Sequence, residues 1–135
     1  MSKPEYLNQL NKIAPSILFT VSRELDPYES WNGDGPNPRD DGYSPYSVDV
    51  TALVIIGGEI IEGAQSLGSS WYRHDEPLGD VHGYLPQMLE EAATELQSTI
   101  GAVSPMGREL TAAIEYMKAV MRQEWEAQQT ARPAV

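Results

Sequence analysis

The chain has 135 residues, 41% of them hydrophobic and none of them cysteine, and its formal net charge is −11. This length suits one domain with one packed core, and the hydrophobic content argues against wholesale disorder. The lack of Cys excludes disulfides, thiolate nucleophiles and cysteine-based zinc or iron–sulfur sites. The acidity disfavours direct binding to nucleic acid phosphates or to an anionic membrane, and it favours a basic partner or simply solubility.

Two features of the sequence bear on localisation, and both favour the cytoplasm. Met1–Glu5 lacks the positive and apolar regions of a signal peptide, and the longest apolar stretch, Ala52–Ile56, is too short to span a bilayer. A secreted domain of this size would often carry disulfides. We therefore expect a cytoplasmic protein with no membrane segment.

The N-terminal segment predicts a short helix followed by a strand. Tyr6, Leu10 and Ile13 recur at helical spacing over residues 4–13, and a proline two residues later ends the helix. Apolar residues then alternate with their neighbours over residues 17–22, which is the pattern of a half-buried strand.

Residues 26–47 change character, because prolines and glycines interrupt any regular pattern. We interpret the segment as an ordered surface loop, since aromatic side chains give it apolar mass to pack. Those aromatic residues are Tyr28, Trp31, Tyr43 and Tyr46. A loop of this length exceeds the usual range, and such loops tend to be functional or disordered.

The clearest strand covers Val48–Ile56, where apolar residues occupy alternate positions. Gly57–Gly58 is a two-residue hairpin signal, and the return strand runs from Glu59 toward Arg73. This turn sets the register so that Val54 opposes Ile61 and Ile56 opposes Glu59. Two glycines indicate bulges or bends within the return strand: Gly63 and Gly68.

A second loop, residues 74–83, holds the densest group of potential metal ligands. They are His74, Asp75, Glu76, Asp80 and His82. Such a group can bind a divalent metal or supply a general base. The spacing matches no zinc pattern, so we favour an ordinary polar loop and expect neither a metal nor a cofactor.

Two amphipathic helices complete the chain. The first is expected over Leu85–Ile100, with three acids facing away from its apolar stripe: Glu90, Glu91 and Glu95. Ser104 and Pro105 begin the second, which would span roughly 39 Å if it continues to Gln129. Such a helix either projects beyond the core or meets a second copy of the chain, with Trp125 as the contact.

Together these elements predict an α+β fold. A three-stranded antiparallel sheet in meander order is covered on one face by an antiparallel pair of C-terminal helices, with the short N-terminal helix at an edge. We expect a single domain over residues 1–130 and a frayed tail at 131–135.

The acidic residues are concentrated in the middle of the chain. Residues 24–95 hold fifteen acids and two bases, a net charge of −13, whereas the remainder carries +2. Trp and Tyr anchor protein interfaces, and the acids among them would steer a basic partner. The alternative is that the rings only pin a long loop onto the sheet. The candidate partner-binding residues are Trp31, Asp34, Asp40, Asp41, Tyr43, Tyr46, Trp71, Asp75 and Glu76.

No nucleophile elbow and no phosphate-binding loop is present in the sequence. We therefore predict a non-enzymatic binding protein that occupies a basic, nucleic-acid-binding site on a partner protein or nucleoprotein complex. This reading requires the central acids to form one continuous face.

In size, charge and lack of a catalytic motif, the chain resembles small acidic phage-encoded inhibitors of bacterial defence, anti-CRISPR proteins among them. That resemblance implies a nucleic-acid mimic. Three alternatives stay open: an acidic dimeric secretion-type chaperone, a small metal-dependent enzyme that uses the loop from His74 to His82, and a domain that is acidic only for solubility. A homodimer would form through the C-terminal helix.

Overall fold

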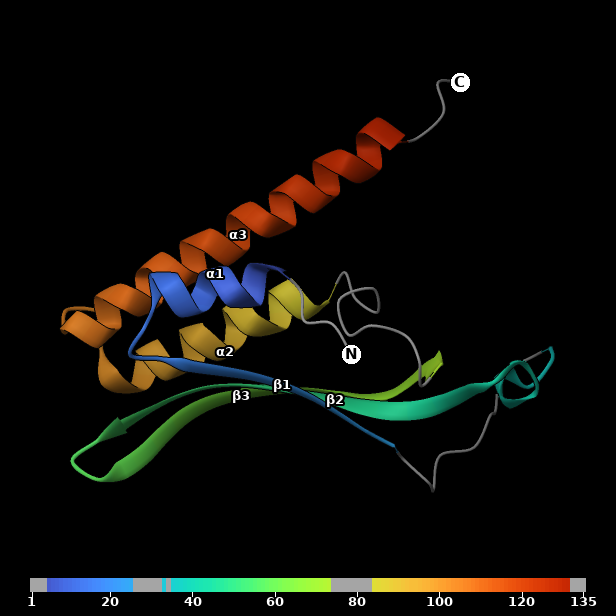
Figure 1. Ribbon diagram of the computed structural model, residues 1–135, viewed down its shortest axis with the longest axis horizontal. Helices are drawn as coiled ribbons and strands as arrows, with labels where there is room; N and C mark the ends of the chain where they lie inside the picture. Colours follow the sequence, from blue (N-terminus) through green and yellow to red (C-terminus); the bar gives the residue numbers. More distant parts are fainter. Residues whose placement is uncertain (1–4, 26–32, 34, 74–83, 132–135) are drawn as a thin grey trace.

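The computed structural model describes residues 5–25, 33, 35–73 and 84–131 (Figure 1). In chain order its elements are α1 (Glu5–Ile13), β1 (Leu18–Leu25), the 3₁₀ helix η1 (Pro38–Asp41), β2 (Tyr43–Ile56), β3 (Glu59–Arg73), α2 (Leu85–Ile100) and α3 (Pro105–Ala131). The expected α+β class is confirmed, and the bounds of α2 agree with those predicted. No helix in the described part of the chain has both the length and the apolar character needed to cross a membrane.

The sheet is antiparallel with strand order β1-β2-β3, as the meander prediction requires. Val54 opposes Ile61, so the register predicted from the turn is confirmed. Gly57 and Gly58 form that turn with φ values of 60° and 83°, in the left-handed region that glycine adopts without strain.

The predicted loop over residues 26–47 is wrong at its C-terminal end, because β2 already begins at Tyr43. Pro45 made a strand look unfavourable, since proline cannot donate to a strand ladder. However, β1 pairs with β2 only as far as Tyr46. Within the described ranges Pro45 therefore has a strand on one side only, where it opposes Trp71 of β3, and a proline is tolerated in such an edge position.

The two glycines of β3 have different roles. The register shifts between Tyr46 and Val48, so that Ser47 faces two residues of β3, and Gly68 is one of them. The expected irregularity at Gly68 is thus confirmed. Gly63 pairs regularly with Ala52, so no bulge lies there. Its lack of a side chain instead allows α2 to approach β3 closely.

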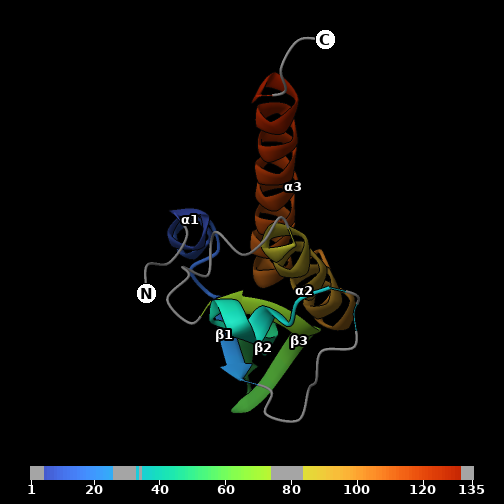
Figure 2. The same cartoon turned by 90° about the vertical axis from the view of Figure 1, so that its right-hand side faces the viewer.

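All three α-helices lie on one side of the sheet (Figures 1 and 2). α2 packs on β2 and β3, while α1 contacts β1. α3 crosses over both of them on the side away from the sheet (Figure 2). The core lies between these layers, and its fully buried side chains include Leu10, Val48, Val50, Val54, Leu85, Leu89, Leu96, Leu110 and Met117.

The last helix begins as the sequence predicts and then runs past the core. The Ser104 hydroxyl accepts a hydrogen bond from the Gly107 amide at 3.0 Å, which makes Ser104 the N-cap. From Met121 onward, no side chain that the structure describes is buried, and the ribbon continues beyond α1 and α2 (Figure 1). Trp125 is 60% exposed on this projecting part. Its contact with a second copy of the chain stays a prediction.

Candidate protein-binding site

Local hydrogen bonds fix the conformation of the acidic turn before β2. The Asn37 side chain accepts a hydrogen bond from the Arg39 amide at 3.0 Å and caps η1. Gly42 ends η1 at a φ of 86°, and its amide donates to the Arg39 carbonyl at 3.1 Å. Asp40 and Asp41 are therefore presented from a fixed turn, and both are exposed.

A hollow of about 370 Å³ lies where η1 meets the end of the hairpin. It is lined by Pro36, Pro38, Asp41, Tyr43 and Trp71. The two proline rings and the two aromatic rings make its walls largely apolar, and the lining includes one carboxylate. This combination suits a side chain with an aliphatic stem and a positive end.

Trp71 already contacts a cation from its own chain. The Arg39 guanidinium carbon lies 5.3 Å from the centroid of the Trp71 ring, within the range of a cation–π interaction. The geometry of the turn thus places a positive group over this ring, and it shows which ligand chemistry the ring accepts.

The structure brings together part of the predicted partner-binding set. Asp41, Tyr43 and Trp71 line the hollow, and Asp40 is next to them on η1. Tyr46 is not part of this group. It is three residues from Tyr43 along β2, so its ring lies on the helix-covered side of the sheet, where the Arg23 guanidinium carbon is 4.7 Å from the ring centroid.

Four of the predicted residues lie outside the part of the chain that the structure describes: Trp31, Asp34, Asp75 and Glu76. Conversely, the sequence reasoning missed Pro36, Pro38 and Arg39. The two prolines were read only as breakers of regular structure, and nothing in the local sequence indicated that Arg39 would stack on a ring thirty-two positions later.

The described acids do not form the one continuous face that the charge argument required. Glu24, Asp49 and Glu62 are on β1, β2 and β3, on the side of the sheet that faces away from the helices. The acids of α2 lie in the helical layer on the other side (Figure 1). The carboxylates that act on a ligand in the hollow are therefore those of Asp40 and Asp41.

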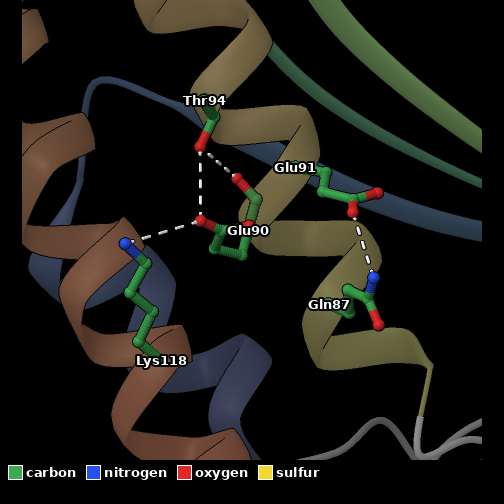
Figure 3. A network of polar contacts seen from close by, with 5 residues as sticks. All are labelled: Gln87, Glu90, Glu91, Thr94 and Lys118. Atoms are coloured by element: carbon green, nitrogen blue, oxygen red, sulfur yellow. Dashed lines mark hydrogen bonds and ion pairs between the residues drawn. The ribbon is translucent and has the colours of Figure 1, made fainter.

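The acids of α2 were expected to face away from the fold, and two of them instead contact other elements. Glu95 Oε2 accepts a hydrogen bond from the Ala64 amide of β3 at 3.2 Å. Glu90 Oε1 lies 3.9 Å from Lys118 Nζ of α3, as Figure 3 shows. Glu91 accepts from Gln87 within the same helix at 3.1 Å (Figure 3). These carboxylates are used within the molecule, so they contribute less to any partner surface.

The metal-dependent alternative falls on residues whose placement is not described, since His74 and His82 both lie in the 74–83 gap. Within the described ranges, no group of three or more His, Asp or Glu residues is arranged to hold a metal ion.

The chain was compared with known proteins at three levels. No protein family, no curated protein and no solved structure matches it. The function therefore has to be inferred from the chemistry of the residues alone.

Proposed function

We propose that this chain is a non-enzymatic binding protein whose hollow takes a Lys or Arg side chain from a basic protein partner. The observation that supports the proposal is the contact between Arg39 and Trp71, at 5.3 Å from guanidinium carbon to ring centroid, beside Tyr43 and Asp41. An aromatic wall next to a carboxylate is the usual environment of a recognised cation.

The proposed interaction has two components of different range. Asp40 and Asp41 attract a basic partner at long range, and this attraction weakens beyond about 8 to 10 Å at physiological ionic strength. Trp71 and Tyr43 act at contact, where a cation–π interaction contributes about 0.5–1 kcal/mol when exposed and about 2 kcal/mol when desolvated. The rings are thus the expected hot spot, and the acids set the association rate.

Many basic protein sites exist to hold nucleic acid, so a compact anionic domain would compete for such a site. A chain of net charge −11 is itself a poor ligand for DNA or RNA, which favours the role of competitor over that of nucleic-acid binder. We extend the proposal to a cytoplasmic inhibitor of the kind that phages use against bacterial defence, anti-CRISPR proteins included. This extension is supported by size and charge only.

The proposal is tested with a defined probe, an arginine-rich decapeptide titrated into the full chain and followed by calorimetry and by amide chemical shifts. We expect Trp71→Ala to weaken binding at least 5-fold, because it removes the ring that the cation contacts. The double variant Asp40→Asn, Asp41→Asn should also weaken binding, and this effect should be larger at low salt than at high salt.

Trp125→Ala is the matched control, because Trp125 is an exposed tryptophan on the far part of α3. It should leave the affinity unchanged, and circular dichroism should show that each variant is folded. Equal affinity of the wild-type chain and folded Trp71→Ala, together with shifts spread over all acidic surfaces, would rule out the hollow as the site.

A further inference from the structure

The free edge of β1 borders a groove that the proposed function does not use. Among the residues that the structure describes, β1 is the first strand of the sheet and pairs only with β2. A hollow of about 200 Å³ follows β1 beside α1, and a second of about 470 Å³ lies where β1 begins, between Pro15–Leu18 and Leu53–Ile55 of β2; both have Asn11 and Leu18 in their linings. They are therefore neighbouring parts of one groove.

The lining of this groove contains consecutive residues of both strands. Leu18–Val21 of β1 line the smaller hollow, and Leu53–Ile55 of β2 line the larger one. The second run is accessible because β1 pairing starts at the Leu18–Leu53 pair, while β2 continues to Ile56. A run of consecutive strand residues exposes backbone amide and carbonyl groups, which is the template on which another strand adds.

Helix α1 forms the wall of the groove on the helical side. Leu7 and Asn8 line the smaller hollow, and Asn11, one turn further on, lines both. No hydrogen bond within the described ranges occupies the amide of Asn8 or Asn11. An Asn side chain both donates and accepts, so these two amides are able to bind the backbone of an extended segment beside β1.

We propose that an extended segment of a basic partner protein adds to β1 as a fourth strand. On its helical side, an apolar side chain would fill the smaller hollow against Leu7, Phe19 and Val21. On the open side it would cover two large apolar side chains at the mouth of the groove, Leu18 and Ile55, which are 53% and 63% exposed.

The charges on the open side specify a basic segment. Glu24 is exposed at the end of β1, on this side of the sheet. Asp49 lies one strand further from the edge, and its carboxylate accepts a hydrogen bond from Ser66 Oγ of β3 at 2.6 Å. A Lys or Arg of the added strand would pair with Glu24, in the field of a chain whose net charge is −11. The occupant is therefore an extended segment in which apolar and basic residues alternate.

A second copy of this chain fits the groove less well. Pairing β1 with β1 of a second copy would place a second α1 in the same layer, where the smaller hollow has only about 200 Å³. It would also bring together two molecules that each carry a net charge of −11.

The test uses a nine-residue peptide of alternating Val and Lys, with blocked ends, titrated into the ¹⁵N-labelled full chain. We expect chemical-shift changes at residues 7–25 and 53–56 and slower hydrogen exchange along β1; a lysine of the peptide that enters the hollow beside Trp71 would give a second, separate set of shifts. A matched peptide with N-methyl groups on the amides that face β1 keeps its side chains and charge. It should bind at least 10-fold more weakly, because strand addition depends on those amides.

Asn8→Trp fills the groove from an exposed position and should weaken binding at least 5-fold. Val103→Trp, at a site that is 81% exposed between α2 and α3, is the control and should have no effect. Trp71→Ala should leave the shifts and exchange protection along β1 unchanged and remove only those at the hollow, which separates this inference from the function proposed for the hollow. Equal affinity for the N-methylated peptide, or a wild-type dimer in sedimentation that Asn8→Trp dissociates, would overturn the proposal.

Discussion

Gly63 of β3 lies directly beneath the backbone carbonyl of Ala92 on α2, with no side chain between the two elements. A Cβ atom at Gly63 would overlap that carbonyl and lie 2.7 Å from the Leu96 amide nitrogen. Both obstacles are backbone, so α2 itself would have to move. We predict that Gly63→Ala lowers the free energy of unfolding by about 2–3 kcal/mol, measured by urea denaturation.

Ala64→Val is the matched control for this substitution. Ala64 is the next residue of β3, and its exposed side chain points to the open side of the sheet. The change should alter stability by less than about 0.5 kcal/mol. A loss of stability in Gly63→Ala as small as that in Ala64→Val would mean that the helix adapts to a side chain at Gly63.

A carboxylate of α2 adds a second link to the same strand. Glu95 Oε2 accepts from the Ala64 amide at 3.2 Å and from Gln65 Nε2 at 3.4 Å. In the described part of the chain β3 pairs only with β2, so no strand there would replace the carboxylate as acceptor for this amide. We predict that Glu95→Ala destabilises the fold by about 1 kcal/mol in the same assay.

Glu91→Ala provides the comparison for Glu95→Ala. Glu91 is one turn earlier on α2 and accepts a hydrogen bond only from Gln87 of its own helix among the contacts in the described ranges. Such i,i+4 pairs contribute about 0.2–0.5 kcal/mol. A loss as large in Glu91→Ala would show that helix propensity, and not the link to β3, explains the effect.

The element order, the hairpin register and the bounds of α2 followed from local signals in the sequence. The turn glycines Gly57 and Gly58 set the register. Apolar residues at every second position indicated the strands, and apolar residues at every third or fourth position indicated the helices. The role of Gly63 was not predictable, because a glycine inside a strand is equally consistent with a bulge and with a close helix. Only the tertiary contact with Ala92 distinguishes them.

The candidate site was partly predictable for a similar reason. Aromatic residues among acids marked Tyr43 and Trp71, and the structure places them around one hollow. Tyr46 was grouped with them because it is near in sequence, but strand alternation turns it to the other side of β2. The α2 acids were counted toward a common face, and their tertiary partners became visible only in the fold.

The contact between α1 and α3 contains a buried hydroxyl that costs stability. The Tyr6 hydroxyl is buried with no hydrogen-bond partner among the described residues. Its burial, together with the nearby Glu124 carboxylate, raises the pKa of Tyr6 above the ordinary value of 10.0. We predict that Tyr6→Phe stabilises the protein by about 1 kcal/mol, because it removes an unsatisfied polar group and keeps the ring.

Tyr84→Phe is the control for the Tyr6 substitution, since Tyr84 is exposed just before α2. Thermal unfolding should show no shift for this variant. A loss of stability in Tyr6→Phe would indicate that the hydroxyl has a partner after all.

Glu124 makes the α1–α3 contact dependent on pH. Partial burial raises the pKa of this carboxyl above its ordinary value of 4.5. The neutral form therefore suits the folded state better than the charged form. The stabilisation that the neutral Glu124 carboxyl provides is fully present below pH 4.5 and is lost as the pH rises through the folded-state pKa.

Glu124→Gln stays neutral at every pH, so it should be more stable than the wild type at pH 7, by less than about 1 kcal/mol because the group is largely solvated. Urea unfolding from pH 3 to pH 8 should show this gain disappearing below pH 4.5. Glu115→Gln, at an exposed position of the same helix, corrects for the loss of one negative charge. The burial explanation fails if the two variants gain stability equally at pH 7.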